Sequence, residues 1–405
     1  MNEQATRHLH YKEIPEEGEL FKRNFVHMPF EDFEGKSEPY ANSSAAAKKY
    51  AADALHSHSL KFSAIIWSDG FESNTNSISI NKNSAANAKT YKYDSSIGGR
   101  TIAFLENFAN RVINVDAKPE YGEQDLSILL TSSAYRDVAR LSVVAAANSK
   151  IKLTLLNLSS SNEKLFAGIL CNINAMEGSS VEINYIHNQG KGASTAYATS
   201  ATAAEKAHIS INNIYVGGSI TKSINAMRLE GDNSSGTINE IAYIDDAQML
   251  DATASITNAG IGTNASADSR VVASGSATAI IKGYAKVTKG AEEAVSHIKE
   301  KGITLDKRAR IEAIPMMSIE EQNVREAKHS AAVAPLNDEV VFYFLARGIN
   351  MESARSLVIK STITSNISAI GSAFAKSIIP SILFAKIEEG ITGGIPPHNV
   401  SGLWF

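Results

Sequence analysis

The sequence is poor in cysteine, tryptophan and proline. Its 405 residues include one cysteine, 2 tryptophans and 9 prolines. The single cysteine, Cys171, cannot form an internal disulfide, and it excludes a self-contained metal site built from four cysteines. Any metal bound by this chain would therefore need ligands from elsewhere.

An excess of charge of either sign is also missing. The chain has 39 basic and 43 acidic residues, which gives a formal net charge of -4. A balance so close to neutral does not favour a surface that binds polyanions. Nucleic acid is therefore not an expected partner.

Long apolar runs are absent as well. The most membrane-like segment, 366–387, is interrupted by Lys376, Pro380 and Lys386, so it is predicted to form two packed helices instead of a membrane span. The segment from Met1 to Phe21 contains several glutamates and lacks the apolar core of a secretory signal. A cytoplasmic protein without membrane partners is therefore expected.

What the chain does have is alternation of apolar and polar residues from about 60 to 333, which predicts strands with one buried face. Ile151, Leu153 and Leu155 point one way, whereas Lys152 and Thr154 point the other. The pattern returns further along the chain, at Val181-Ile183-Tyr185, Ala207-Ile209-Ile211, Ile238-Ala242-Ile244 and the odd positions from Val271 to Val287.

These strands recur at nearly regular intervals. The markers Ile151, Val181, Ile209, Ile238 and Val271 are separated by 30, 28, 29 and 33 residues. Such a repeat, with turns rich in Asn, Gly and Ser, indicates a solenoid of stacked coils, most naturally a parallel β-helix. Small residues at odd positions suit a narrow interior; these are Ala273, Gly275, Ala277, Ala279, Gly283 and Ala285. A β-sandwich, whose short strands alternate similarly, is the rival fold.

The two ends of the chain differ from this repetitive middle. The first 60 residues are acidic and aromatic and then Ala-rich, which predicts an arm followed by a helix from Ser44 to Leu55. After Pro335 the apolar period becomes helical. Asn337 is the expected N-cap of a first helix and Gly348 its stop, and a second helix should start at Asn350. The predicted apolar faces are Val340, Val341, Phe344 and Leu345 in the first helix, and Ala354, Leu357 and Val358 in the second.

The fold predicted from these patterns is mainly β. A right-handed parallel β-helix occupies 61–334, an N-terminal arm and helix occupy 1–60, and a C-terminal helical domain occupies 335–405.

An ordered series of motifs between 282 and 349 resembles a known family. The motifs are Lys282-Gly283-Tyr284-Ala285-Lys286-Val287, Ile303-Thr304-Leu305-Asp306, the stretch from Arg310 to Pro315, Lys328-His329-Ser330-Ala331-Ala332-Val333, and the stretch from Asn337 to Ile349. Their order and spacing resemble the C-terminal part of the SufB/SufD family, the scaffold subunits of the SUF iron-sulfur cluster assembly system. The resemblance is specific over about 276 to 359, and Ser330, Ala332 and Ala334 depart from the family pattern.

The local sequence pattern and the family resemblance predict different roles for His329. Ala327, Ala331 and Val333 share its strand face, which favours a hydrogen-bonded core histidine. In SufD-type subunits, however, the matching histidine is a candidate iron-sulfur ligand at a subunit interface, and imidazole is a suitable ligand for iron. The resemblance therefore implies that His329 binds a transient cluster. It leaves open whether a flavin is involved.

Two further positions indicate which type of subunit this is. SufB-type subunits place a cysteine and a glutamate where this chain has Glu300 and Ser330. A chain without both ligands is expected to be SufD-like and not the main sulfur acceptor. Cys171 shares its predicted strand face with Ile169 and Ile173, so it is expected to be an inert core thiol.

The resemblance also implies a role and partners. The chain should be non-enzymatic, should pair with a SufB-like paralogue or with itself as a dimer, and should dock a SufC-like ABC ATPase on its C-terminal helices. The dock is predicted on residues Val341, Phe344, Leu345, Arg347, Leu357 and Val358. Two alternatives remain: an intracellular β-helix enzyme acting on polysaccharides, which would need a clustered acid-base or calcium site, and a purely structural solenoid.

Overall fold

The computed structural model describes residues 25–35, 62–67, 70–82, 95–132, 134–159 and 164–392. The helix predicted from Ser44 to Leu55 lies outside the described residues, as does most of the predicted N-terminal arm.

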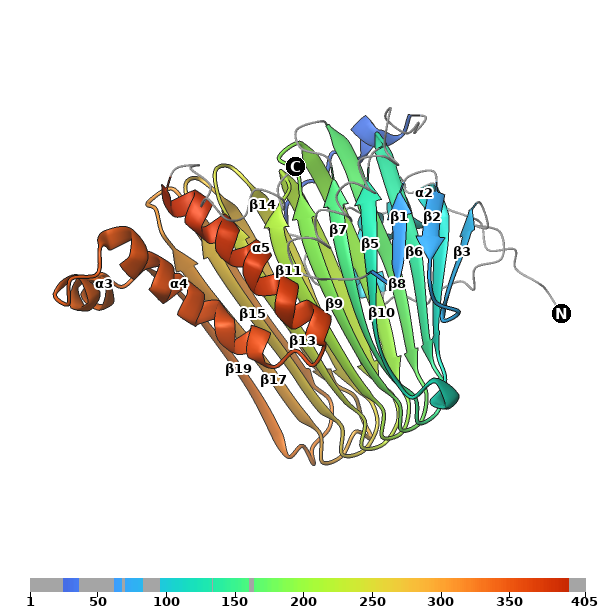
Figure 1. The fold of residues 1–405 in the computed structure, drawn as a ribbon. Coiled ribbons are helices and arrows are strands. Elements are labelled where there is room, and N and C mark those ends of the chain that lie inside the picture. The colour runs from blue at the N-terminus through green and yellow to red at the C-terminus, as the bar shows by residue number, and fades with distance from the viewer. Residues whose placement is uncertain are drawn as a thin grey trace.

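The protein is mainly β, with 54% strand, and forms a β-solenoid of about 8 turns (Figure 1). Four short strands come first: β1 (Ala64–Trp67), β2 (Gly70–Ser73), β3 (Ile78–Lys82) and β4 (Arg111–Ala117). The stacked coils are built from β5 (Glu123–Ser132), β6 (Arg136–Ala145), β7 (Lys150–Ser159), β8 (Leu165–Ala175), β9 (Ser180–Gln189), β10 (Ala193–Ala203), β11 (His208–Gly217), β12 (Ile220–Leu229), β13 (Ser235–Ile244), β14 (Met249–Asn258), β15 (Asn264–Ala273), β16 (Thr278–Val287), β17 (Val295–Thr304), β18 (Arg310–Ile319) and β19 (Glu326–Pro335).

The strands form two sheets in which every coil contributes one strand to each. Sheet 1 has the order β19-β17-β15-β13-β11-β9-β7-β5-β1-β2, and sheet 2 has the order β18-β16-β14-β12-β10-β8-β6-β4-β3. From β5 onward, each strand pairs in parallel with the strand two positions along the chain, for example β9 with β11 and β10 with β12. The predicted parallel β-helix is confirmed, and the β-sandwich rival is wrong.

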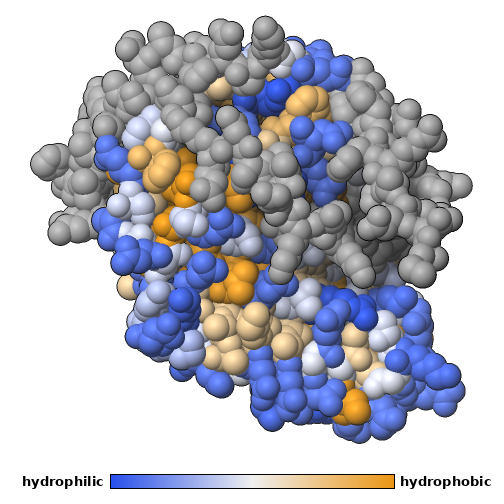
Figure 2. All heavy atoms as spheres, turned by 90° about the vertical axis from the view of Figure 1, so that its right-hand side faces the viewer, coloured by the Kyte–Doolittle hydropathy of each residue, from blue (hydrophilic) through white to orange (hydrophobic). Residues whose placement is uncertain are grey.

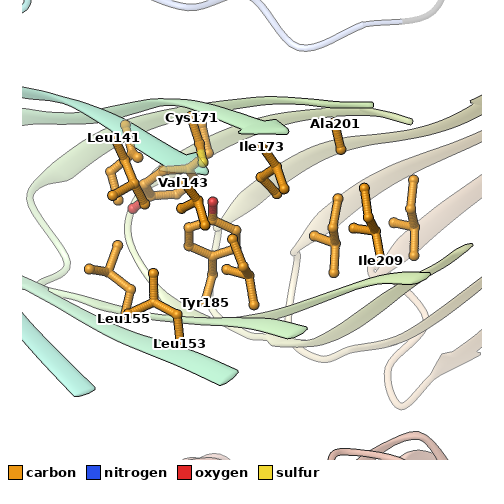
Figure 3. Close-up of a cluster of buried hydrophobic side chains, with 14 of the residues drawn as sticks. Leu141, Val143, Leu153, Leu155, Cys171, Ile173, Tyr185, Ala201 and Ile209 are labelled. Atoms are coloured by element: carbon orange, nitrogen blue, oxygen red, sulfur yellow. The ribbon is translucent and has the colours of Figure 1, made fainter. Parts of the chain in front are cut away.

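The core lies between the two sheets, where the predicted apolar positions face one another. In Figure 3, Leu141, Val143 and Cys171 point from sheet 2 toward Leu153, Leu155 and Tyr185 of sheet 1. The period-2 pattern puts these side chains inside because successive residues of a strand point to opposite faces. The alternation in the sequence therefore places the solenoid interior correctly.

A left-handed residue recurs at the same turn in successive coils. These residues are Asn148, Gly178, Lys206, Asn233, Gly262 and Glu293, with φ between 55° and 66°. Gly275, which the sequence analysis placed in the interior, also has a left-handed backbone (φ 65°) and lies in a turn. Gly283 does face the interior, because a Cβ there would lie 2.5 Å from Ile298 of the other sheet.

A helix that the alternation did not predict covers the outer face of sheet 2. Helix α2 (Ser95–Phe108) lies there with the short 3-10 helix η3 (Phe30–Phe33), and the rings of Phe30 and Phe104 stack 4.6 Å apart. A second 3-10 helix, η5 (Pro119–Tyr121), leads into β5.

Figure 2 views the molecule from the side on which β1, β2 and β3 lie, and shows a band of apolar surface bordered by polar side chains.

Three helices follow the last strand: α3 (Asp338–Leu345), α4 (Met351–Ser368) and α5 (Ala373–Thr392). The predicted N-caps are confirmed, because Asn337 accepts a hydrogen bond from the Glu339 N–H and Asn350 accepts one from the Ser353 N–H, each at 2.8 Å. Segment 366–387 is the end of α4 and most of α5, as predicted. In the part of the chain that the structure describes, no helix is long and apolar enough to span a membrane.

The buried face of α4 differs from the predicted stripe. Ala354 is buried, but Leu357 is exposed and Val358 is half-buried. The helix packs against sheet 1 through Ile359, Ile363 and Ile367, an i, i+4 row that continues into the apolar cluster with α5. The predicted stripe was wrong at Leu357 because a single helix pattern does not say which side meets the sheet.

Candidate functional site

The solenoid ends in two strands that each have a neighbour on one side only. β19 ends sheet 1 and pairs with β17, and β18 ends sheet 2 and pairs with β16. In the described chain no further coil covers them, and β19 is exposed along nearly its whole length. Unpaired edge strands present free N–H and C=O groups that can pair with another chain. We call this region, β18 together with β19, the open end.

His329 lies on the last strand of the open end. It is in register with Ile298 of β17, whose side chain reaches the interior face of Gly283 in the opposite sheet. His329 therefore lies on the strand face that continues the solenoid interior, but its side chain is exposed because no coil follows β19 among the described residues. The interpretation of His329 as a core histidine is wrong for this chain, although the predicted face, shared with Ala331 and Val333, is correct.

Glu300 lies one coil deeper, on the same interior face. It is 2% exposed and pairs in register with Ser269 on one side and Ala331 on the other. Burial raises the pKa of Glu300 to about 8; the Gly283 N–H opposes this shift and Glu240 adds to it. The position that the resemblance gives to a thiolate therefore holds a carboxyl group with a strong preference for its proton.

A second carboxyl group, that of Glu240, is buried two strands further from the open end. Ser269 donates a hydrogen bond to it at 2.8 Å, Asn225 donates one at 3.2 Å, and the Tyr215 hydroxyl donates one at 3.4 Å. Burial raises the pKa of Glu240 to about 7, against the effect of these donors. A line of polar side chains thus runs inside an otherwise apolar solenoid and leads to the open end.

Sequence reasoning missed Glu240 as a site residue, although a signal was present. In the stretch Ile238-Asn239-Glu240-Ile241-Ala242, the alternation places Glu240 on the same face as Ile238 and Ala242. A charged residue at an interior position of a strand is rare and marks a place that needs partners.

Cys171 is remote from the open end. Its rung of sheet 2 passes through Thr199, Asn225, Ala254 and Gly283 before reaching Pro315 of β18. Five strand spacings amount to roughly 24 Å. The thiol is fully buried, and burial raises the pKa of Cys171 to about 12. The predicted core position of Cys171 is confirmed, and its raised pKa is consistent with the predicted lack of reactivity, since a thiolate is needed for reactivity.

The described residues contain no group of three or more His, Cys, Asp or Glu side chains that could hold a metal ion. On the strand faces that continue the solenoid interior, the described residues offer the imidazole of His329 and, one coil deeper, the buried carboxyl group of Glu300. The donors present could therefore contribute to a metal cluster only as part of a larger ligand set. No described feature favours the calcium cluster that a polysaccharide-acting enzyme would need.

The predicted dock residues are divided between buried and exposed positions. Val341 is buried, Phe344, Leu345 and Val358 are half-buried, and Arg347 and Leu357 are exposed. The guanidinium of Arg347 lies 3.5 Å from the centre of the Tyr343 ring. These residues therefore do not form one exposed stripe.

Two exposed aromatic residues of α3 were missed. Phe342 is 69% exposed and Tyr343 is 53% exposed, and Val340 and Met351 add exposed apolar surface beside them in the sequence. The signal was that, after Asp338 and Glu339, α3 is apolar on all sides, as its sequence DEVVFYFL shows. A short helix that is apolar all round cannot hide every side chain against one neighbour. We call Val340, Phe342, Tyr343, Met351 and Leu357 the α3–α4 patch.

Most of the chain matches a known protein family. Residues 129–362 match the family described as SUF system FeS cluster assembly, SufBD core domain. Similar proteins include an iron-sulfur cluster assembly SufBD family protein of Mycobacterium leprae, 25% identical over 145 residues, which are 36% of this chain and 17% of the relative.

Two further relatives carry the same family description. One, from Galdieria sulphuraria, is 24% identical over 151 residues, 37% of this chain and 68% of the relative. The other, from Synechocystis, is 25% identical over 151 residues, 37% of this chain and 31% of the relative. The chain thus spans only about a sixth of the length of the mycobacterial relative that it matches.

Proposed function

Since the chain belongs to the SufBD family of the SUF iron-sulfur cluster assembly system, we propose that it acts as a SufD-like, non-enzymatic scaffold subunit in the cytoplasm. In this role it holds a nascent iron-sulfur cluster, its cargo, at an interface with another subunit. The observation that carries the proposal is the exposed imidazole of His329 on the last strand of the solenoid.

The SufD-like assignment rests on the residues around His329. Imidazole nitrogen is a known ligand of iron and of iron-sulfur clusters. The resemblance gives SufB-type subunits a thiolate and a carboxylate where this chain has Glu300 and Ser330. Because Glu300 is buried and burial raises its pKa, and because Ser330 is a weak ligand, His329 supplies one ligand and the partner subunit supplies the others.

The open end is the proposed pairing surface. β18 and β19 each leave one edge without a described strand neighbour, and strand addition at such edges is a common mode of protein association. Exposed apolar side chains there, such as Ile319 and Val333, would be covered by a partner. The partner is a SufB-like paralogue or a second copy of this chain, and pairing would bring ligands from two subunits to His329.

The α3–α4 patch is the proposed dock for a SufC-like ABC ATPase. Exposed aromatic side chains are enriched where binding energy is concentrated. Phe342 and Tyr343 project from a helix that buries Val341 alone, so the solenoid gains little from them. ATP-driven movement of the docked partner would then act on the subunit through α3 and α4.

The test is His329→Ala in the assembled system. We expect anaerobic reconstitution with the partner subunits to yield little or no cluster, whereas the melting temperature and the recovery of the ATPase complex stay unchanged, because the side chain is exposed. The matched control is Lys328→Ala, the exposed neighbour on the other face of β19. Normal cluster yield per folded complex in His329→Ala would overturn the ligand role.

A further inference from the structure

Helices α4 and α5 lie across the outer face of sheet 1 (Figure 1). Most of the contact is apolar: Ile378, Ile382 and Leu383 of α5 share a buried cluster with residues of β7, β9 and β11. Apolar contacts of this kind are non-directional. They hold the helices against the sheet, but they define the location of the helices along the solenoid less sharply than hydrogen bonds do.

Three charged residues stand on neighbouring strands beneath the α4–α5 loop. Asp125 of β5 is in register with Lys152 of β7, and Lys152 is in register with Glu182 of β9. Lys152 pairs with Glu123, at 2.5 Å. The carboxylates of Asp125 and Glu182 thus flank a lysine on the face that meets the loop.

Both carboxylates bind the loop and the first residue of α5. Glu182 accepts hydrogen bonds from the N–H groups of Gly371 (2.7 Å) and Ser372 (2.8 Å). Asp125 accepts bonds from the Ser372 hydroxyl (2.7 Å) and the Ala373 N–H (2.8 Å). Carboxylates are stabilised at a helix N-terminus by its free N–H groups and its dipole, so α5 is capped by residues almost 200 positions or more away in the sequence.

The loop approaches the sheet so closely that a side chain at position 371 would displace the side chains beneath it. A Cβ on Gly371 would lie 2.6 Å from the Glu182 carboxylate and 3.2 Å from Lys152. Ser372 is fully buried, and its hydroxyl also lies 3.2 Å from that of Thr154. The backbone of the α4–α5 loop therefore packs closely against the side chains of β7 and β9 beneath it.

A polar seam continues from this point along the sheet to α4. Asn239 donates to Asn212 at 2.7 Å, Asn212 donates to Asn184 at 2.8 Å, and Asn184 lies 3.5 Å from Thr154. Asp268 lies next to Asn239 on the neighbouring strand, β15. Arg270 donates a hydrogen bond to the Asp268 carboxylate and another, of 2.7 Å, to the Thr362 carbonyl of α4. Directional bonds thus fix the hairpin at its loop and along α4.

We propose that Asp125 and Glu182 are positioning residues that set the location of the α4–α5 hairpin on the solenoid and thereby the orientation of the α3–α4 patch. The role of that patch rests on the proposed function; the positioning itself does not. The carboxylates lie on β5 and β9, in the half of sheet 1 far from the open end, whereas the patch follows the last strand. Helix α4 connects the two.

The first experiment measures the hairpin without any partner. In Asp125→Ala/Glu182→Ala, we expect the amides of Gly371, Ser372 and Ala373 to exchange hydrogen at least tenfold faster, while amides in β9 and β11 keep their protection. The control is Glu177→Ala, which removes an exposed carboxylate from the turn before β9. Asp125→Asn/Glu182→Gln keeps an acceptor oxygen at each position and should restore part of the protection.

A distance measurement separates positioning from general loosening. Spin labels on Glu352→Cys, at the start of α4, and Lys307→Cys, on the turn after β17, report the angle of the hairpin; buried Cys171 does not compete for the label. We expect a narrow distance distribution in the otherwise native chain and a broad or shifted one in Asp125→Ala/Glu182→Ala. Gly371→Ala, whose Cβ would crowd the Glu182 carboxylate, should do the same.

The outcomes distinguish the two proposals. An unchanged distance distribution in both variants would overturn the positioning role. If the distribution broadens and capture of the ATPase falls in parallel, positioning acts on the dock. If it broadens but the native chain captures no ATPase, the positioning role stands and the proposed dock fails.

Discussion

At the residue scale, the most unusual feature is a pair of buried carboxyl groups inside a β-solenoid. Glu240 is surrounded by three hydrogen-bond donors, whereas Glu300 lies against the backbone of Gly283 with far less support. Burial without a cation favours the neutral form of a carboxyl group. The two side chains therefore link the stability of the last coils to pH.

For Glu300, the direction in which stability changes with pH can be worked out. Its pKa in the folded protein, about 8, lies above its ordinary value of 4.5. Its contribution to stability is then fully present below pH 4.5 and is lost as the pH rises through 8, because the folded state must ionise a buried group.

We therefore expect Glu300→Gln to be more stable than the native chain at pH 9, by on the order of a few kcal/mol, and to differ less at pH 5. Urea unfolding at both pH values measures this. Glu292→Gln, at an exposed position, should show no such difference. Equal stability of Glu300→Gln and the native chain at pH 9 would show that Glu300 is not a source of this alkaline instability.

At the element scale, the C-terminal helices divide into a packed pair and a projecting one. α4 and α5 share an apolar cluster with sheet 1, whereas α3 buries Val341 alone. Removing residues 335–405 would therefore expose the outer face of sheet 1 and leave an aggregation-prone protein. The dock has to be tested by point substitutions in α3.

Phe342→Ser and Tyr343→Ser together should weaken ATPase capture at least tenfold. The expected melting temperature is unchanged, because both side chains are more than half exposed. Titration calorimetry with the purified ATPase gives the affinity, and Met176→Ser, an apolar residue of similar exposure on a solenoid turn, is the control. Undiminished affinity would place the dock on another surface.

At the scale of the whole molecule, the strands inside the solenoid have a hydrogen-bonded neighbour on both sides, whereas the last strands, β18 and β19, have one on one side only. Neighbouring coils satisfy each other's backbone groups, but β18 and β19 have no following coil among the described residues. An open edge of this length invites pairing with another chain unless something covers it. The proposed pairing surface and the proposed cluster ligand therefore belong to the same pair of strands.

Val333→Asp should reduce pairing through this end, because a desolvated charge without a partner opposes association. Val333 is 41% exposed on β19, so the fold should tolerate the change. Light scattering after size exclusion measures the mass of the assembly, alone and mixed with a SufB-like subunit. The control is Ile261→Asp, 48% exposed on a side turn. If Val333→Asp assembles like the native chain, the interface lies elsewhere.

The sequence by itself determined the strands, their inward faces and the solenoid, because each coil repeats the same period-2 pattern at nearly the same length. It also determined both helix caps after Pro335, since Asn337 and Asn350 act on residues within the same turn. The family could be identified because its motifs lie in one continuous stretch, which the matched range 129–362 covers.

Only the tertiary structure decided which of these positions are covered. His329 has the sequence pattern of a core residue, yet it is exposed because, in the part of the chain that the structure describes, no coil follows β19. Leu357 has the pattern of a packed residue, yet it faces solvent because α4 turns another side to sheet 1. The hydrogen bonds from the α4–α5 loop and the start of α5 to Asp125 and Glu182 join positions 189 to 248 residues apart. A local pattern gives the face of a strand or helix, but burial depends on which element, if any, lies opposite that face.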